Sequence, residues 1–429
     1  MSPSTNTSSG GGLKRAVRRW EVVALAINDV VGSGVYLLPA AAVALLGPAS
    51  LGAVVLAGAA VGLVVLCFAE AATYFDEPGS AYLYTRTAFG DVAGFQVGWM
   101  TWLTRVTSVA SLSAGFAQAL GYLLPDAEVG LSRALVISVP LAILAVINVV
   151  GVEAGARTSV VLAIAKLLPL FVFVAAGIFV ADVSLIATQE VSQAGGWGAA
   201  ALLLLYAFAG FENTAAAAGE FRDPKRDVPF ALFVHLGLVV LLYVAVQATV
   251  MAILPDSGSS KTPLADAARL FLGPWGGTFL TVGAVISILG TNANTVFAAP
   301  RYLFALGRDG YGPEGLAAIH PRFRTPWVAL LATLAIAWPL ALYGSFFGLA
   351  ALSVVARLFT YVGTAAAVPV LRRKLKAPEG AFRIPFGPVV PAAAILLAFA
   401  FASGASRENL VSAAAALAAG FVVYRLRRK

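Results

Sequence analysis

The sequence predicts an all-α integral membrane protein of about twelve transmembrane helices, and three observations carry this prediction. Hydrophobic residues make up 60% of the chain and charged residues only 12%, and the mean hydropathy reaches +0.87. Apolar windows long enough to cross a ~30 Å hydrocarbon layer, roughly 20 residues each, recur along nearly the whole chain. Basic residues gather in alternate connections between these windows. We therefore expect the lipid bilayer to surround most of the chain.

The expected spans are apolar windows that turn residues or charges separate from one another. In the first part of the chain they cover residues 20–46, 51–74, 92–123, 133–150, 159–181 and 197–219. In the second part they cover residues 229–253, 276–306, 327–343, 346–371, 388–404 and 409–425. An even number of spans places both ends of the chain on one side of the membrane.

The distribution of lysine and arginine predicts which side that is. With these spans, most of the 29 basic residues of the chain fall on the side of the two termini, and the opposite side holds only Arg133, Lys261, Arg269 and Arg407. Cytoplasmic connections of membrane proteins carry the excess of lysine and arginine. The sequence thus predicts a multi-pass protein of the cell membrane with both termini in the cytoplasm.

The composition also argues against several classes of function. The single cysteine, Cys67, allows no internal disulfide, and the two histidines, His235 and His320, are too few for most histidine-based metal catalysis. No phosphate-binding glycine-rich loop with its lysine and no HExxH pattern occurs in the sequence. We therefore expect no cofactor, no metal, no ATP-driven pump and no enzyme. The net charge of +8 reflects basic membrane connections, and no nucleic acid partner is expected.

Two of the expected spans contain residues that interrupt a helix. The first holds Gly32, Ser33 and Gly34, and the sixth holds Gly210 beside Glu212. A broken membrane helix exposes backbone N–H and C=O groups, which is tolerated only where protein or a water-filled cavity satisfies them. Small residues can also simply allow two helices to pack closely, so one GSG segment alone does not show that a helix is broken to bind a ligand. Two breaks five spans apart favour an inverted repeat of five helices plus five, with a ligand between the breaks.

Several motifs, in their order and spacing, resemble the amino acid-polyamine-organocation (APC) superfamily of transporters. They are GSGVYLLPA at 32–40, EPGSAYLYTRTAFG at 77–90, KLLPL at 166–170, FAGFE at 208–212, GEFRDPKRDVPFAL at 219–232, GRDGYGPE at 307–314 and HPRFRTP at 320–326. The likeness runs from about residue 18 to about residue 374. It implies a ten-helix inverted-repeat transport core at 18–374. The polar, glycine-rich start of the chain predicts a disordered cytoplasmic tail at 1–17, and hydropathy alone predicts two additional transmembrane helices at 375–429.

The resemblance also implies how an amino acid would bind. Its carboxylate would lie against the backbone at Ser33 and Gly34 and the Ser33 hydroxyl. Its ammonium would meet carbonyl groups near Val30 and around Tyr206, Phe208 and Ala209. The half-helix that follows the first break has a partial positive charge at its start, and this charge also favours a carboxylate there. The implied substrate-binding residues are Val30, Gly32, Ser33, Gly34, Tyr206, Phe208, Ala209, Gly210 and Phe211, with Tyr206, Phe208 and Phe211 as walls of the side-chain pocket.

Ionisable residues within the spans are costly, at ~2.5–3.5 kcal/mol each on insertion scales, and call for a reason. Removal from water disfavours the ammonium form of Lys166, which would let this group gain and lose a proton during a transport cycle. In the resembling family a lysine here stands where sodium-coupled relatives bind an ion, so we expect proton coupling; a static ion pair or a snorkelling lysine is the alternative. The resemblance makes Glu212 a gate or proton-sensing residue, and a structural hydrogen bond at the break is its alternative reading.

Other polar residues in or near the spans have structural readings by default. Arg105 and Arg357 are expected to line a water path, to pair with an acid such as Glu212, or simply to pack. The remaining residues are Arg301 as a snorkelling anchor, His235 as a packed histidine, Asn292 and Asn294 as a polar stripe, and Glu70, Asp76 and Glu77 as partners of basic connections.

These observations together predict a secondary active transporter of amino acids that works by alternating access, as symporter or antiporter. Neutral amino acids are expected because no pair of acids is visible for a basic side chain, and proton coupling is expected from Lys166. An exchanger or exporter of amino acids or polyamines within the same family is the first alternative. A membrane channel is an alternative from another class, which a long asymmetric chain with inward-facing breaks does not favour. The sequence leaves the oligomeric state open.

Overall fold

The computed structural model describes residues 17–75, 80–150, 156–194, 196–216, 221–379 and 381–425. These residues form helices and no strands, with an isolated bridge between Val17 and Phe221. The helices of the first half are α1 (Arg19–Val30), α2 (Ser33–Leu46), α3 (Ser50–Thr73), α4 (Ser80–Phe89), α5 (Asp91–Leu120), α6 (Gly130–Val150), α7 (Ala156–Gly177), α8 (Ser184–Ala187), α9 (Gly196–Ala207) and α10 (Glu212–Ala216). Those of the second half are α11 (Pro224–Ile253), α12 (Pro263–Leu272), α13 (Pro274–Arg308), α14 (Trp327–Tyr343), α15 (Phe346–Lys374), α16 (Val389–Ser403) and α17 (Arg407–Arg425).

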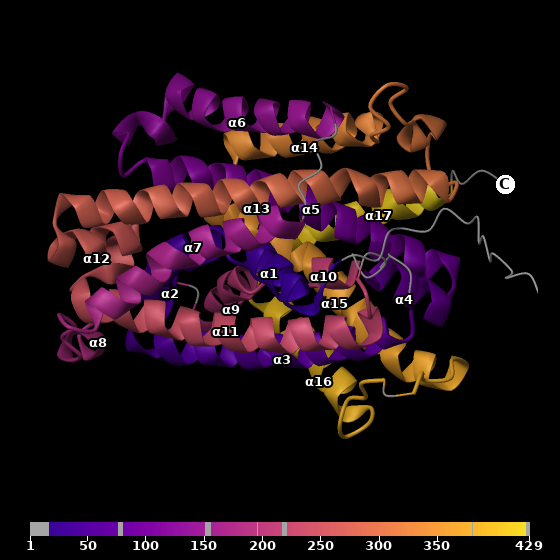
Figure 1. The fold of residues 1–429 in the computed structure, drawn as a ribbon, viewed down its shortest axis with the longest axis horizontal. Coiled ribbons are helices and arrows are strands. Elements are labelled where there is room, and N and C mark those ends of the chain that lie inside the picture. Colours follow the sequence, from indigo (N-terminus) through magenta and orange to yellow (C-terminus); the bar gives the residue numbers. More distant parts are fainter. Residues whose placement is uncertain are drawn as a thin grey trace, which may run out of the picture.

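The long helices lie roughly along the longest axis of the molecule (Figure 1). The short helices α8 and α12 lie at one end of this bundle, and α4 lies at the other. The helix α17 also finishes at the end that holds α4, where Tyr424 stacks on Tyr311 with 5.6 Å between ring centroids. The start of α1 also lies towards this end, since Arg19 pairs at 2.8 Å with Asp227 in the first turn of α11, which begins on the side that holds α4.

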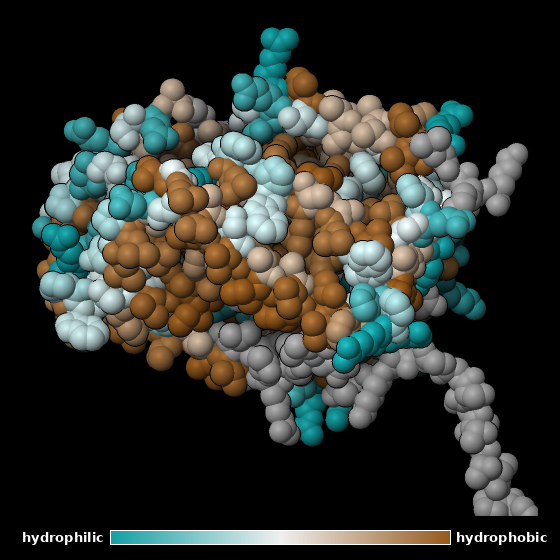
Figure 2. Space-filling view, turned by 90° about the horizontal axis from the view of Figure 1, so that it is seen from above, coloured by the Kyte–Doolittle hydropathy of each residue, from teal (hydrophilic) through white to brown (hydrophobic). Residues whose placement is uncertain are grey.

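The outer surface is apolar in the way a bilayer requires. Within the described part of the chain, five stretches are long and apolar enough to cross a membrane by length and composition: Ser33–Thr73, Gly130–Val150, Pro224–Ile253, Pro274–Arg308 and Phe346–Lys374. Large apolar side chains such as Phe179 and Leu131 are 88% and 76% exposed, which is unfavourable in water and favourable in lipid. Hydrophobic residues gather over the middle of the face in Figure 2, and hydrophilic residues gather mainly towards its two ends.

The interrupted helices lie inside the bundle. Helix α2 packs against α9, and α1 contacts α7, α11 and α13. Around them, α5 packs against both α13 and α15, and α3 packs against α11. All fourteen residues of α2 are buried, although a membrane protein can expose apolar residues to lipid at no cost. The broken segments are thus enclosed by other helices, as exposed backbone groups at membrane depth require.

Each apolar window expected from the sequence contains helix in the structure, and the number of membrane crossings stays a prediction. The first window is divided into α1 and α2 and the sixth into α9 and α10, at the glycines that suggested the breaks. The search for long apolar windows did not predict α4 and α12, because ten residues of mixed polarity are too short and too polar to span a bilayer. The expected tail at 1–17 lies, apart from Val17, outside the described residues.

Candidate functional site

The two breaks border one cavity near the middle of the bundle. A cavity of about 30 Å³ lies between the first break, the second break and the helices α5, α13 and α15. This volume holds about two water molecules, so a bound substrate requires the surrounding side chains or helices to move apart. The lining residues are Asp29, Val30, Gly32, Ser33, Gly34, Arg105, Ser108, Leu112, Tyr206, Ala209, Gly210, Asn213, Thr291, Thr295 and Arg357.

Glycine is needed at both breaks because each broken helix touches the other. A Cβ atom on Gly34 would lie 2.7 Å from the Cα atom of Ala207 in α9, closer than real contacts allow. A Cβ atom on Gly210 would lie 2.6 Å from the backbone oxygen of Asp29 in α1, and Gly210 has a φ of +126°, which side chains rarely tolerate. The breaks therefore pack on each other, and both present backbone groups to the same cavity.

Hydroxyl groups of two tyrosines lie within hydrogen-bond distance of polar groups at the breaks. Ser33 begins α2, and its hydroxyl lies 3.4 Å from the hydroxyl of Tyr206. The hydroxyl of Tyr243 in α11 lies 3.1 Å from the carbonyl oxygen of Ala207 and 3.5 Å from that of Val30, one carbonyl from each break. The N–H groups of the first turn of α2 have no partner within their own helix, which leaves them available to an anion.

Lys166 lies behind the first break and is fully buried. Its ammonium nitrogen donates hydrogen bonds of 2.8 Å to the carbonyl oxygen of Asn28 and 2.8 Å to the hydroxyl of Thr291. The Thr291 hydroxyl also lies 3.1 Å from the carbonyl oxygen of Val31. The C-terminal end of α1 carries a partial negative charge, which favours a cation at this place. Among the described residues Lys166 forms no salt bridge, so its partners are neutral oxygen atoms.

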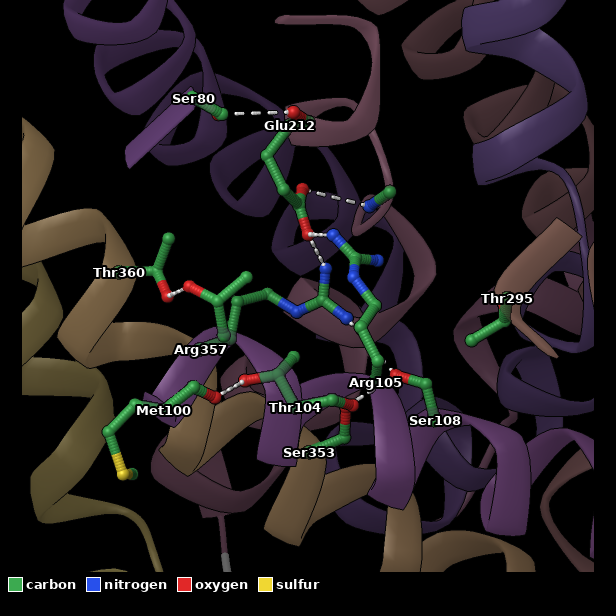
Figure 3. Close-up of polar contacts among 12 residues, drawn as sticks. Ser80, Met100, Thr104, Arg105, Ser108, Glu212, Thr295, Ser353, Arg357 and Thr360 are labelled. Atoms are coloured by element: carbon green, nitrogen blue, oxygen red, sulfur yellow. Dashed lines mark hydrogen bonds and ion pairs between the residues drawn. The ribbon is translucent and has the colours of Figure 1, made fainter. Parts of the chain in front are cut away.

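A buried triad of Arg105, Glu212 and Arg357 lies beside the second break (Figure 3). Arg105 in α5 donates to Glu212 Oε1 at 3.0 Å, and Arg357 in α15 donates to the same oxygen. The other carboxylate oxygen accepts the backbone N–H of Gly210 at 3.1 Å. All three side chains are only 3% exposed. Glu212 therefore ties the break to two helices that are distant in sequence, through charge-assisted hydrogen bonds.

Asp29 contributes a second negative charge to the cavity, and the sequence analysis did not select it. It belongs to the last turn of α1, and its carboxylate accepts a hydrogen bond of 3.0 Å from Asn294 in α13. The formal charges of Asp29 and Glu212 equal in number those of Arg105 and Arg357. An acidic residue three positions before Gly32 in an apolar window is a signal that the search for mid-span charges could have used.

The structure brings most of the predicted binding residues to the cavity and leaves two aromatic ones out. Val30, Gly32, Ser33, Gly34, Tyr206, Ala209 and Gly210 line the cavity, whereas Phe208 and Phe211 do not. The ring of Phe208 packs on Tyr243 at 5.1 Å, and that of Phe211 stacks on Tyr361 at 5.6 Å. Their rings are buried in the core. Of the three residues expected as walls of the side-chain pocket, Tyr206 lines the cavity.

Three of the remaining candidates, Asn292, Arg301 and Glu70, have structural partners. Asn292 donates to the Ser113 hydroxyl at 2.9 Å, and Arg301 donates to the backbone oxygen of Phe297. His235 is buried, and its ring nitrogens have no hydrogen-bond partner in the part of the chain that is described. Glu70 pairs with Arg372 at 2.6 Å, as expected for a structural charge pair. Asp76 and Glu77 lie outside the described residues.

Comparison with known proteins shows which family this chain belongs to. The sequence profile of the amino acid permease family matches residues 18–422. The serine/threonine exchanger SteT of Bacillus subtilis (strain 168) is 29% identical over 405 residues, which is 90% of each chain. The branched-chain amino acid permease BcaP of the same organism is 27% identical over 444 residues, covering 98% of this chain and 94% of BcaP. The methylthioribose transporter of that organism is 26% identical over 405 residues, covering 90% of this chain and 87% of the relative.

This match covers both breaks, Lys166 and the buried triad, as well as the long apolar helices that mark a multi-pass membrane protein. The relatives are membrane transporters and not enzymes. Since the profile spans nearly the whole chain, the protein belongs to the amino acid permease family, whose substrates are amino acids.

Proposed function

We propose that this permease carries neutral amino acids across the cell membrane by alternating access, coupled to protons, with the substrate held between the two breaks. The observation that carries the proposal is that both breaks border one cavity lined by Ser33, Gly34, Tyr206 and Ala209. A zwitterion needs donors for its carboxylate and acceptors for its ammonium. The start of α2 supplies N–H groups, and the carbonyls near Val30 and Ala209 supply acceptors.

The charges around the cavity support a neutral side chain. Glu212 accepts from both Arg105 and Arg357, and the Asp29 carboxylate accepts from Asn294. The formal charges of the two acids and the two arginines cancel, so a side chain without charge leaves this balance unchanged. The relatives SteT and BcaP are named for serine and threonine and for branched-chain amino acids, whose side chains are neutral. We extend this property to the present chain as part of the proposal.

Proton coupling is proposed for Lys166. An ammonium group that is fully buried and hydrogen-bonded to neutral oxygen atoms carries a desolvation cost that these bonds and the charge of Asp29 offset only in part. Loss of its proton removes that cost and also removes the charge that strengthens its hydrogen bonds to Asn28 in α1 and Thr291 in α13. Because α1 forms the first break, protonation of Lys166 is linked to the position of the binding residues. Glu212 acts in the same cycle as a gate that joins the second break to α5 and α15.

The proposal includes the topology expected from the sequence. It comprises twelve spans with both termini in the cytoplasm, a tail at 1–17, a ten-helix core at 18–374 built as a five-plus-five inverted repeat, and two further spans within 375–429. The first and last described helices have their outer ends on one side of the bundle, which agrees with an even number of crossings.

Uptake into proteoliposomes tests the function. The purified protein is reconstituted in sodium-free vesicles, and uptake of a panel of labelled amino acids is measured with and without an inward proton gradient. Lys166→Met keeps the length of the side chain without its titrating amine, and Lys261→Met changes an exposed lysine as the matched control. We expect gradient-driven uptake by the wild type and by Lys261→Met, and none by Lys166→Met.

Three results would contradict the proposal. Uptake that is unchanged when a protonophore collapses the gradient would rule out proton coupling. Uptake only into vesicles preloaded with an amino acid would establish exchange in its place, the activity for which SteT is named. Uptake of methylthioribose but of no amino acid would refute the substrate class.

A further inference from the structure

Two arginine side chains form one wall of the cavity, and they have more hydrogen-bond donors than acceptors around them. Arg105 and Arg357 both line the cavity, and both direct a guanidinium nitrogen at the same oxygen of Glu212 (Figure 3). A guanidinium group carries several N–H donors and no acceptor. The Nε atoms of both arginines are buried and have no hydrogen-bond partner among the residues that the structure describes.

The surrounding hydroxyl groups do not remove this surplus of donors. Arg357 Nη2 donates to the hydroxyl of Ser108 at 3.3 Å, a long bond. That hydroxyl also lies 2.8 Å from the hydroxyl of Ser353, so it is shared between two partners. Ser108 itself lines the cavity beside the two arginines. A ligand oxygen at this wall would therefore meet guanidinium and hydroxyl donors on α5 and α15.

The formal charge of the wall decides which kind of oxygen fits. The two arginines are matched in number by Glu212 within the triad and by Asp29 at the end of α1, which lines the same cavity. A side-chain carboxylate would add an uncompensated negative charge to these four groups, and burying such a charge is costly. An aliphatic side chain would exclude water from the guanidinium groups and leave their N–H donors unpaired, which is also costly. A hydroxyl or carboxamide oxygen accepts from these donors without changing the charge.

We propose that Arg105, Arg357 and Ser108 form a side-chain recognition site that selects neutral amino acids with a side-chain hydroxyl or carboxamide over aliphatic amino acids of the same size. This inference rests on the proposed function, since it requires an amino acid to occupy the cavity between the breaks. It narrows the neutral amino acids to those that carry a side-chain oxygen. Discrimination against an isostere without the oxygen is expected to be roughly tenfold to a hundredfold, the effect of one hydrogen bond to a charged donor.

The test measures dissociation constants of ligand pairs that differ in the oxygen. Purified full-length protein in detergent is titrated by calorimetry with L-threonine against L-valine, with L-asparagine against L-leucine, and with L-aspartate. We expect threonine to bind at least about tenfold more tightly than valine, and asparagine at least about tenfold more tightly than leucine. Aspartate should bind more weakly than asparagine because it adds a negative charge.

Variants connect the discrimination to the wall. Arg105→Met removes one guanidinium group and should bring the threonine and valine constants together, mainly by weakening threonine binding. Ser108→Ala is a milder change that keeps both arginines, and it should reduce the threonine-to-valine ratio in part. Arg269→Met changes an exposed arginine in α12 and should keep the wild-type ratio.

Several outcomes would overturn the inference. Equal binding of threonine and valine by the wild type would refute it, and tighter binding of aspartate than of asparagine would show that the wall selects a carboxylate. An equal loss of threonine and valine binding in both Arg105→Met and Ser108→Ala would show that these residues only hold the structure. Absence of binding by every amino acid would refute the proposed function as well, whereas binding without discrimination would refute this inference alone.

Discussion

Replacement of Glu212 by glutamine tests whether the buried triad holds the helices around the second break. Glutamine keeps the size of the side chain and removes its negative charge. Arg105 and Arg357, whose side chains are only 3% exposed, would then lie beside each other without a counter-charge in the triad. The formal charge of the triad would rise from one positive charge to two. We expect a large loss of stability, because unpaired buried charges are strongly destabilising.

The magnitude follows from the bonds that the carboxylate makes. Glu212 accepts one hydrogen bond from each arginine and one from the backbone N–H of Gly210. A hydrogen bond to a charged group contributes ~1.5–3 kcal/mol, so weakening the two arginine bonds costs ~3–6 kcal/mol. Removal of one partner from a buried ion pair costs ~3–5 kcal/mol in other proteins, which agrees. We therefore expect the free energy of unfolding to fall by ~3–5 kcal/mol.

The assay is denaturant unfolding in detergent, followed by tryptophan fluorescence, on matched variants. Glu128→Gln removes the carboxylate that faces Lys261, a side chain that is 72% exposed, and it should cost at most ~1 kcal/mol. Adding Arg105→Gln to Glu212→Gln should recover part of the loss, because it removes one of the two unpaired cations. If Glu212→Gln were no less stable than Glu128→Gln, or if the effects of the double variant simply added, the reasoning about the triad would be wrong.

Three further predictions concern the breaks and the ion pair between Glu70 and Arg372. Gly34→Ala places a Cβ atom 2.7 Å from the backbone of α9, so proteoliposome uptake should be lost while the protein still inserts and purifies; normal uptake would contradict the close contact of the breaks. Thr291→Val keeps the shape but removes a hydroxyl bonded to Lys166, and uptake should fall roughly tenfold, the effect of one hydrogen bond, with an unchanged circular dichroism spectrum. Glu70→Gln weakens two bonds of 2.6 Å from Arg372 and should lower the free energy of unfolding by ~1–3 kcal/mol; an unaltered denaturation midpoint would show that this pair contributes nothing.

The helices and the two breaks could be predicted from the sequence because their signals are local. Hydrophobic runs fix where a segment leaves water, and Gly32, Gly34 and Gly210 mark the places where a helix stops. Lys166 stood out because an ionisable residue in an apolar run is costly wherever it lies. The short helices α4 and α12 escaped prediction, since their mixed polarity gives them no membrane signature.

The sequence named many of the residues around the cavity but did not show which of them contact one another. The sequence named Glu212, Arg105 and Arg357 separately and offered pairing with Glu212 only as one possibility for the arginines. Tyr243, which lies near a carbonyl oxygen of each break, and Asp29, which lines the cavity, were not selected. A tyrosine in an apolar helix has no sequence feature that reveals which carbonyl its hydroxyl will meet.

The sequence by itself determined that this chain is an all-helical membrane protein with two interrupted helices, because apolar runs and glycines act through the local backbone and the solvent around it. Only the tertiary structure decided that Arg105 and Arg357, 107 and 145 positions from Glu212, share one of its oxygen atoms. It also decided that Phe208 and Phe211 face the core and that Tyr206 faces the cavity. Such choices depend on how whole helices pack, since the partners of a side chain are set by the position and rotation of the helices around it.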